Sequence, residues 1–213
     1  MTALDLGLPS IGGLDGVPTT TDKQTAKDFT SDQEVRWCPG CGDFAVLNVL
    51  RRALADLDIA PHNVLVASGI GCSSNLPGFI NAYGFHGLHG RSLPVATGAK
   101  FGNHDLTVIA TGGDGDGYGI GGNHFAHTAR RNVDLTYIVM NNGTYGLTKG
   151  QASPTSPSGY GENVEEDLDP IMLGLSIPGS TFIARGYTGQ PAQLLELTTA
   201  ALEHAQSGRG FAF

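Results

Sequence analysis

The fold is decided by the stretch Gly112–Asn142, which reads GGDGDGYGIGGNHFAHTARRNVDLTYIVMNN. One apolar run, Leu106–Thr111, precedes this stretch, and a second, Leu135–Met140, lies near its end. Short apolar runs bounded by turn residues are typical of strands buried in a parallel sheet. The segment between them, which starts near Ile120, is predicted to be a helix. The stretch therefore predicts a strand–helix–strand unit.

Two oxygen-bearing side chains, Asp114 and Asn142, follow the two predicted strands at their carboxyl ends. The carboxyl ends of neighbouring parallel strands lie side by side, at the edge where open α/β sheets bind ligands. Mg²⁺ prefers oxygen ligands and usually takes some of them from a bound phosphate. Glycines let backbone N–H groups approach that phosphate, and the positive end of the next helix points the same way. The pattern favours a divalent cation that holds a phosphate group.

Two other interpretations of the glycine-rich turn remain open. Gly117, Gly119 and Gly122 match the dinucleotide fingerprint G-x-G-x-x-G, which is weak on its own. Asp114 and Asp116 would repel a pyrophosphate unless a metal bridged them. Alternatively, the turn binds no ligand. Ordering so many glycines costs backbone entropy, which argues against a turn without a ligand.

Composition and charge bound the remaining possibilities. We expect one domain over residues 31–213, preceded by a flexible polar tail over residues 1–30. A net charge of −8 argues against nucleic acid as the main partner. No apolar run approaches the length of a membrane span, and we recognise no signal peptide. A cytoplasmic protein without a membrane partner is therefore expected.

The rest of the chain predicts alternating helices and strands, and hence an α/β fold whose mostly parallel sheet carries helices on both faces. Helices are predicted over residues 41–57, 93–101 and 191–205. Further strands are predicted over residues 63–68, 180–185 and 210–213, and a polar loop over 154–169. Because the sequence stops inside an apolar run, we expect it to be cut short at its C-terminus.

Three cysteines, Cys38, Cys41 and Cys72, form the second informative pattern. The segment Trp37–Cys41, WCPGC, superficially resembles a thioredoxin site, but polar residues precede it where that site needs a strand. A disulfide is not expected in a chain without an export signal. A structural zinc site or an iron–sulfur cluster would each need a fourth ligand. Histidines that are candidates for zinc by residue type are His62, His86 and His89.

Six motifs then occur in a fixed order along the chain. They are RWCPGCG (36–42), SGIGCSS (68–74), HGLHGR (86–91), TGAK (97–100), GDGDG (113–117) and NNGTYGLTKGQ (141–151). Together they resemble the β subunit of 2-oxoacid:ferredoxin oxidoreductases, most closely the 2-oxoglutarate branch. The resemblance runs from Val35 to Phe213, and it implies the fold that binds thiamine diphosphate (ThDP).

The resemblance implies a role for each residue that matches a motif. Asp114, the side chain of Asn142 and the carbonyl of Thr144 would ligate Mg²⁺. Residues that would contact ThDP are Ile70, Gly71, Cys72, Ser73, His89, Gly115, Asp116, Gly146 and Leu147. Cys38, Cys41 and Cys72 would hold a [4Fe–4S] cluster, with a fourth cysteine expected beyond Phe213.

The resemblance also implies an activity. The enzyme would decarboxylate a 2-oxoacid oxidatively, in the best-matching branch 2-oxoglutarate to succinyl-CoA, with coenzyme A as co-substrate and ferredoxin as electron acceptor, reversibly in principle. An α subunit would complete a heterodimer or an α2β2 assembly and supply the glutamate that activates ThDP, because no glutamate of this chain falls inside a cofactor motif. The alternative is a non-oxidative ThDP decarboxylase with a zinc-filled or empty cysteine site.

Lys149 bears on the choice of substrate. Pyruvate-type members of the family tend to carry a small residue at this position, and an ammonium near the cofactor could pair with the distal carboxylate of 2-oxoglutarate. The alternative is a lysine that binds phosphate or only solvent. Asn75 stands where some members with broad specificity have a lysine, and it offers no charge.

Overall fold

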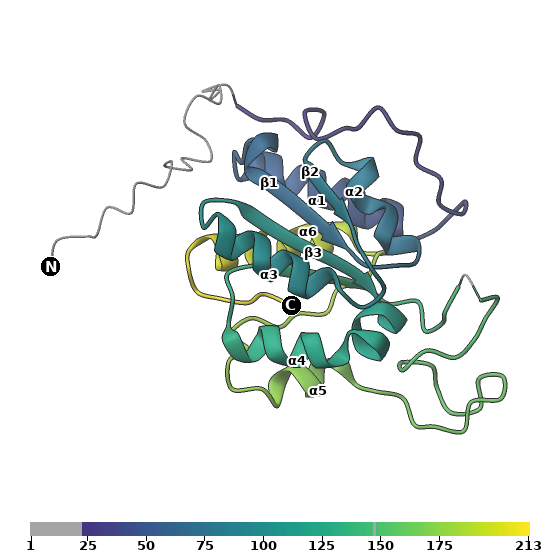
Figure 1. Ribbon diagram of the computed structural model, residues 1–213. Helices are drawn as coiled ribbons and strands as arrows, with labels where there is room; N and C mark the ends of the chain where they lie inside the picture. Colours follow the sequence, from purple (N-terminus) through teal and green to yellow (C-terminus); the bar gives the residue numbers. More distant parts are fainter. Residues whose placement is uncertain (1–22, 147) are drawn as a thin grey trace, which may run out of the picture.

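The computed structural model describes residues 23–146 and 148–213, which form a central parallel sheet covered by helices (Figure 1). The strands are β1 Val64–Ser68, β2 Tyr83–His86, β3 Thr107–Gly113 and β4 Thr136–Met140. They lie in the order β2-β1-β3-β4, and every pair is parallel. Three of the four confirm the predicted strands. The strand β2 was not predicted because all its residues are exposed, so no apolar run marks it.

Two short segments extend the sheet beyond β4. Ala212 forms parallel bridges with Thr136 on one side and with Phe182 on the other. The N–H of Tyr137 donates to the carbonyl of Ala212 at 2.7 Å, and the N–H of Phe213 donates to that of Phe182 at 3.0 Å. The strands predicted over 180–185 and 210–213 are therefore wrong in extent. Each is reduced to one bridged residue, Phe182 in the first segment and Ala212 in the second.

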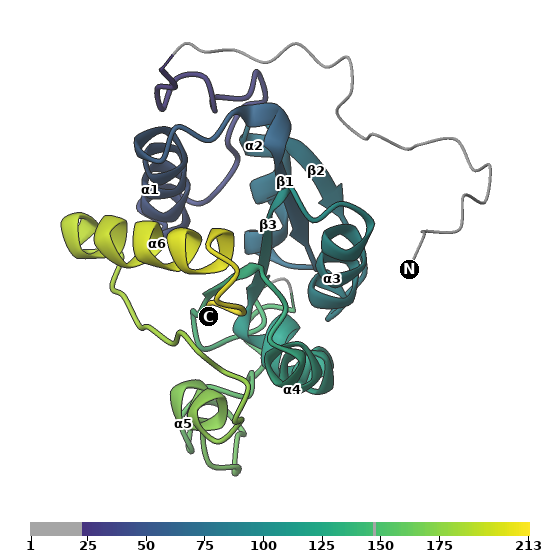
Figure 2. The same cartoon turned by 90° about the vertical axis from the view of Figure 1, so that its left-hand side faces the viewer.

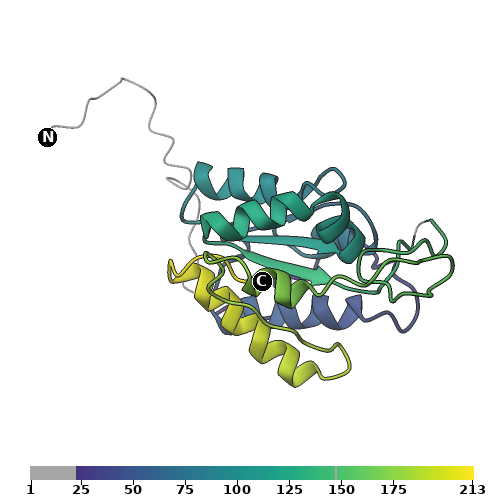
Figure 3. The same ribbon diagram turned by 90° about the horizontal axis from the view of Figure 1, so that it is seen from below.

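Helices cover both faces of the sheet, as predicted. The helices α1 (Asp43–Asp56) and α6 (Pro191–Gln206) lie on one face, and α3 (Ser92–Gly102) and α4 (Gly122–Arg131) lie on the other (Figures 2 and 3). The first three of these match the predicted helices to within two residues. Short elements complete the fold: η1 Pro61–Asn63, η2 Cys72–Asn75, α2 Leu76–Phe79, the π-helical turn η3 Gly115–Ile120 and α5 Pro170–Leu175.

The core is divided between the two faces of the sheet. On one face Leu47, Leu50 and Leu54 of α1 bury their side chains at a helical spacing against the strands. On the other face Phe125 of α4 packs among aromatic rings, 6.1 Å from the ring centroid of Phe211. None of the helices among the described residues is long and apolar enough to cross a bilayer.

The packed domain begins earlier than predicted. Phe29 is completely buried in the core, and Thr30 forms an antiparallel bridge with Ile80. The N–H of Asn81 donates to the carbonyl of Phe29 at 3.0 Å. The expected tail is therefore wrong for its last residues, because one large apolar side chain is enough to anchor a polar segment. Residues 1–22 of that tail lie outside the described residues.

Candidate functional site

A cleft of about 1400 Å³ opens at the carboxyl ends of the strands. Its walls come from the segments that follow β1, β3 and β4, together with the loop around residues 184–188 and the first residues of α1. This is the edge at which parallel α/β sheets bind ligands, because the chain turns away from the sheet there and leaves a crevice. Most of the residues singled out in the sequence line this cleft.

Asp114 lies at the floor of the cleft and is only 1% exposed. Gly113 pairs with Met140 across β3 and β4, so Asp114 and Asn142 leave the sheet side by side, as their spacing predicted. The N–H of Asn142 donates to Oδ1 of Asp114 at 3.4 Å. The side-chain Oδ1 of Asn142 accepts from the N–H of Thr144 at 3.2 Å, so two of the three expected Mg²⁺ ligands lie in one turn, next to Asp114.

Two hydroxyl groups that the sequence did not reveal hold the carboxylate of Asp114. Ser153 and Thr155 both donate to its Oδ2, Thr155 at 2.8 Å. Thr155 belongs to the predicted polar loop 154–169, and Ser153 directly precedes it; the two residues are 41 and 39 residues away from Asp114 in sequence. The cluster SPTS at 153–156 was visible in the sequence, but no local rule connects it to a distant aspartate.

The helix that follows Asp114 starts sooner than predicted. The turn η3 begins at Gly115, directly after the aspartate, and α4 continues from Gly122. Gly115 has no room for a side chain, since a Cβ there would lie 2.2 Å from Cε1 of Tyr145. The hydroxyl of Tyr145 donates to the carbonyl of Gly115 at 3.1 Å. Burial, followed by the charges of Asp114 and Asp116, raises the pKa of Tyr145, so its hydroxyl keeps its proton.

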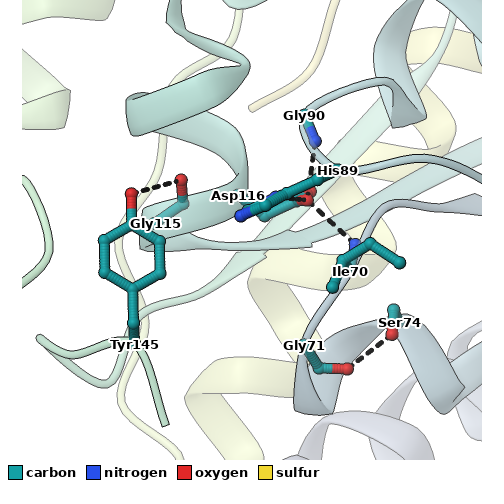
Figure 4. A network of polar contacts seen from close by, with 8 residues as sticks. All are labelled: Ile70, Gly71, Ser74, His89, Gly90, Gly115, Asp116 and Tyr145. Carbon is teal, nitrogen blue, oxygen red and sulfur yellow. Dashed lines mark hydrogen bonds and ion pairs between the residues drawn. The ribbon is translucent and has the colours of Figure 1, made fainter. Parts of the chain in front are cut away.

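Asp116 directs its carboxylate towards two neighbouring loops, which carry Ile70 and His89 (Figure 4). Its Oδ1 accepts from the N–H of Ile70 at 2.9 Å, from the N–H of Gly90 at 2.8 Å and from Nδ1 of His89 at 2.7 Å. Figure 4 shows His89 beside this carboxylate, joined to it by the contact between Nδ1 and Oδ1. The predicted contact residues Ile70, His89 and Asp116 are thus tied together at one end of the cleft.

The loop after β1 carries the remaining predicted contacts. Gly71 has φ +115°, a conformation that glycine adopts readily and other residues rarely reach. Ser73 is buried, and its Oγ has no hydrogen-bond partner among the described residues. Both residues and Cys72 line the cleft. A buried hydroxyl without a partner is costly, and a ligand that accepts its hydrogen would relieve that cost.

The three cysteines lie on adjoining loops at one end of the cleft. Cys38 and Cys41 form a tight turn in which the N–H of Cys41 donates to the carbonyl of Cys38 at 3.0 Å. Nε1 of Trp37 donates to the carbonyl of Cys72 at 2.8 Å and so joins the two loops. All three thiols are free. Burial raises the pKa of Cys72, and the charges of Asp43, Cys41 and Cys38 raise it further.

The thiols are close enough to influence each other, but they do not form a finished metal site. Within residues 23–146 and 148–213, no three His, Cys, Asp or Glu side chains converge on a position that could hold a metal ion. WCPGC lies in the loop before α1, without the preceding strand of a thioredoxin site. Of the histidines considered for zinc, His86 and His89 line the cleft, whereas His62 borders a smaller pocket with Asp105, a residue near the start of β3.

The predicted substrate residue lies at the margin of the cleft. Lys149 is exposed and has φ +66°, and its N–H donates to the carbonyl of Gly146 at 3.2 Å. Gly146 and Thr148 line the cleft, while Lys149 is absent from its wall. Leu147 lies outside the described residues.

Residues 58–213 match the C-terminal TPP binding domain of thiamine pyrophosphate enzymes. The chain belongs to this family. Thiamine pyrophosphate is another name for ThDP, so the match agrees with the fold predicted from the motifs.

Three proteins illustrate the similarity. The chain is 44% identical over 211 residues to "2-oxoglutarate oxidoreductase subunit KorB" of Mycobacterium tuberculosis, covering 96% of this chain and 56% of the relative. It is 49% identical to "2-oxoacid:ferredoxin oxidoreductase subunit beta" of Saccharolobus solfataricus, covering 79% and 57%. A 2-oxoglutarate:ferredoxin oxidoreductase from Magnetococcus marinus, solved with 2-oxoglutarate, coenzyme A and succinyl-CoA bound, matches with a TM-score of 0.84 at 44% identity, over 90% of this chain and 66% of that one.

These names confirm the resemblance seen in the motifs. The chain spans a little over half the length of the two curated relatives, so they contain segments that have no counterpart in it.

The residues at the cleft floor fit a diphosphate held by a metal. Asp114 supplies a buried carboxylate, and Asn142 and Thr144 supply oxygens in the adjoining turn. The hydroxyl of Ser73 lacks a partner, and Gly71 leaves open space on the same wall, since a Cβ there would meet nothing within 4 Å. This set of hard oxygen donors is the one that Mg²⁺ selects, in a cavity large enough for a cofactor.

Proposed function

We propose that this chain binds ThDP with Mg²⁺ in the cleft and acts in the oxidative decarboxylation of a 2-oxoacid. The observation that supports the proposal most is the buried carboxylate of Asp114, placed at the ends of β3 and β4 beside Asn142. A buried carboxylate that faces a cleft and has only neutral partners is poised for a cation, since an uncompensated charge there is costly. Asp114, Asn142 and the Thr144 carbonyl would hold the metal.

When bound, ThDP supplies a nucleophilic carbon and an electron sink for decarboxylation. The residues of this chain bind and orient it. Ser73 would donate its free hydroxyl hydrogen to the diphosphate, and the N–H groups at the start of η3 would offer it the positive end of a helical turn. Tyr145 fixes the backbone of Gly115 and closes the side of the cleft.

The cysteines support the oxidative form of the reaction. Cys38, Cys41 and Cys72 would give three of the four thiolates that a [4Fe–4S] cluster takes as a rule. A cluster at this end of the cleft would pass electrons one at a time to ferredoxin. Free thiols and ferredoxin belong to a reducing compartment, so we place the assembled enzyme in the cytoplasm.

We infer that the site is completed by an α subunit. In the family that the motifs resemble, a glutamate activates the cofactor, and none of this chain's six glutamates lines the cleft. The partner would supply that glutamate in a heterodimer or an α2β2 assembly.

For the substrate we propose 2-oxoglutarate, with coenzyme A as co-substrate. Two observations support this choice: the names of the relatives, and Lys149 at the margin of the cleft. The direction of the reaction is open, because each step is reversible in principle.

The proposal is tested with the chain co-purified anaerobically with its α subunit. We expect reduction of ferredoxin that depends on both 2-oxoglutarate and coenzyme A, and iron and sulfide bound to the complex. The chain alone should show no turnover. As a matched variant, Cys38→Ser should abolish electron transfer and leave ThDP binding intact, because Cys38 is exposed and does not line the cleft.

Two results would contradict the proposal. Decarboxylation by the isolated chain at the rate of the complex would exclude a required glutamate from the partner. A colourless complex with stoichiometric zinc that releases an aldehyde would show a non-oxidative ThDP decarboxylase instead.

A further inference from the structure

The Asp116 carboxylate has an unusual set of partners for a residue of a cofactor-binding turn. It is buried, and one of its oxygens, Oδ1, accepts three hydrogen bonds (Figure 4). Two donors are backbone N–H groups, from Ile70 after β1 and Gly90 after β2. The third is Nδ1 of His89 at 2.7 Å. One atom thus joins the carboxyl ends of three neighbouring strands.

The glycines around Asp116 are adapted to this arrangement. A Cβ at Gly69 would lie 2.0 Å from Oδ2 of Asp116, and one at Gly112 would lie 3.1 Å from it. Gly90 has φ +69°, which lets its N–H turn towards the carboxylate. Any side chain at Gly69 would displace the carboxylate, so glycine at this position is needed to keep Asp116 in place.

The geometry fixes which nitrogen of His89 carries a proton. Backbone N–H groups can only donate, so the oxygen that receives two of them must be an acceptor. The ring of His89 must therefore donate to Oδ1 from Nδ1. In the neutral ring the second nitrogen, Nε2, then carries no hydrogen and can only accept. Nε2 has no partner among the described residues, and His89 lines the cleft.

We propose that Asp116 is a positioning residue that holds His89 in the Nδ1–H tautomer. The free Nε2 of His89 then serves as a hydrogen-bond acceptor for the ligand in the cleft. The identity of that ligand rests on the proposed function. In that case a hydrogen-bond donor on ThDP or on the bound substrate would meet Nε2. Tyr145 limits the ring on its other side, with the two ring centroids 6.2 Å apart and the planes at 84°.

The tautomer is measured directly by ¹⁵N NMR on the full chain labelled at histidine, without any cofactor. The signals of His89 are assigned as those missing from a His89→Asn variant. At a pH where the ring is neutral, we expect the Nδ1–H pattern for His89. A ring that carries its proton on Nε2 would overturn the proposal. This readout does not depend on whether the chain binds ThDP, so it separates this proposal from the proposed function.

Two substitutions at Asp116 extend the test. Asp116→Asn should keep the Nδ1–H tautomer, because the N–H groups of Ile70 and Gly90 hold an oxygen in the same place. Asp116→Ala should shift His89 towards the Nε2–H tautomer that isolated histidine favours. An unchanged tautomer in the alanine variant, or its loss in the asparagine variant, would contradict the assigned geometry. If the alanine variant fails to fold, the His89 tautomers of the wild type and of the asparagine variant still test the proposal.

Binding gives the functional readout. The amide of asparagine at position 89 can still donate to Asp116, but it has no counterpart of Nε2. His89→Asn should therefore keep the melting temperature and weaken the binding of ThDP with Mg²⁺ by about three- to tenfold, as expected for one hydrogen bond. Unchanged affinity would overturn the role of Nε2, whereas a wild-type chain that binds no ThDP would count against the proposed function alone.

Discussion

Asp114 and Asp116, separated by a single glycine, have different partners and different roles. Asp114 accepts hydrogen bonds from hydroxyl groups and lies at the proposed metal position, whereas Asp116 accepts from backbone N–H groups and a histidine. They point in different directions because residues two apart in a helical turn do not face each other. One short motif thus places two carboxylates in different surroundings.

The charge of Lys149 is predicted to select a dicarboxylic 2-oxoacid. In the assembled enzyme, Lys149→Met removes the charge and keeps the length of the side chain. A charge-assisted hydrogen bond is worth about 1.5–3 kcal/mol, so kcat/KM for 2-oxoglutarate should fall roughly ten- to a hundredfold. Pyruvate and 2-oxobutyrate, which have no distal carboxylate, should be affected little. Steady-state kinetics on the three substrates checks this. Equal losses on all three would assign Lys149 to the cofactor, to coenzyme A or to the fold.

The sequence predicts those site residues whose position follows from a neighbouring segment of the chain. Asp114 and Asn142 could be placed side by side because each directly follows an apolar run, and the ends of adjacent parallel strands meet. The partners of both aspartates could not be predicted, because Ser153, Thr155 and Ile70 reach them from 39 to 46 residues away. Such contacts depend on how loops fold over the cleft, which no periodicity encodes.

At the scale of elements, the junction between the loop after β2 and the turn η3 depends on Gly90. A Cβ there would lie 2.6 Å from the backbone nitrogen of Gly121, and φ is +69°. Gly90→Ala should therefore destabilise the chain by more than about 1 kcal/mol, since the backbone conformation alone costs that much. Gly98→Ala is the matched control. Gly98 lies inside α3, with nothing within 4 Å of a new Cβ, and the change should stabilise by about 0.5–1 kcal/mol.

Urea unfolding of the two glycine variants and the wild type measures both effects. The opposite signs are the informative result, because both substitutions add the same methyl group. A Gly90→Ala chain as stable as the wild type would mean that the contact between the loop and η3 is loose.

His204 is predicted to make the docking of α6 sensitive to acid. Its ring is buried, with Nε2 2.9 Å from Oγ1 of Thr181 and its centroid 5.4 Å from that of Phe182. Burial lowers the pKa of His204, and the nearby charge of Arg209 lowers it further. The unfolded chain then binds a proton near pH 6.5 that the folded chain resists. Stability should therefore fall as the pH drops below about 6.5 and level off below the folded pKa.

The slope from one such group cannot exceed about 1.4 kcal/mol per pH unit. His204→Gln should flatten this part of the profile when the free energy of unfolding is measured between pH 7.5 and 5. The same substitution at the exposed His104 is the control for loss of a histidine in general. A His204→Gln chain with an unchanged slope would contradict the assignment.

The elements themselves were predictable where burial gave them a pattern. The helices α1, α3 and α6 and the strands β1, β3 and β4 follow from apolar periodicity, with their ends shifted by one to two residues. The strand β2 could not be predicted, because an exposed edge strand has no apolar run. The length of the strand around Phe182 was predicted too long, because this segment pairs with only one short neighbour. Periodicity reports burial and says nothing of how many neighbours a segment has in the sheet.

At the scale of the whole molecule, we propose that the chain carries one side of an active site. The cleft is lined by oxygen groups that fit a metal and by a histidine hydrogen-bonded to a carboxylate, and none of the chain's glutamates lines it. The relatives it matches are longer, and their names describe subunits of oxidoreductases. On the proposed function, the chain alone would bind a metal-bridged diphosphate, whereas turnover would need a partner.

The most direct test of the central claim is the affinity of the chain for ThDP, measured by calorimetry with and without Mg²⁺, in the wild type and in Asp114→Asn. The substitution keeps the shape of the side chain and removes the charge that the metal needs. We expect Mg²⁺-dependent binding by the wild type and a loss of at least about ten- to a hundredfold in the variant, with binding kept in the control Asp56→Asn on the exposed side of α1. A folded Asp114→Asn chain that binds ThDP with unchanged affinity would contradict the claim.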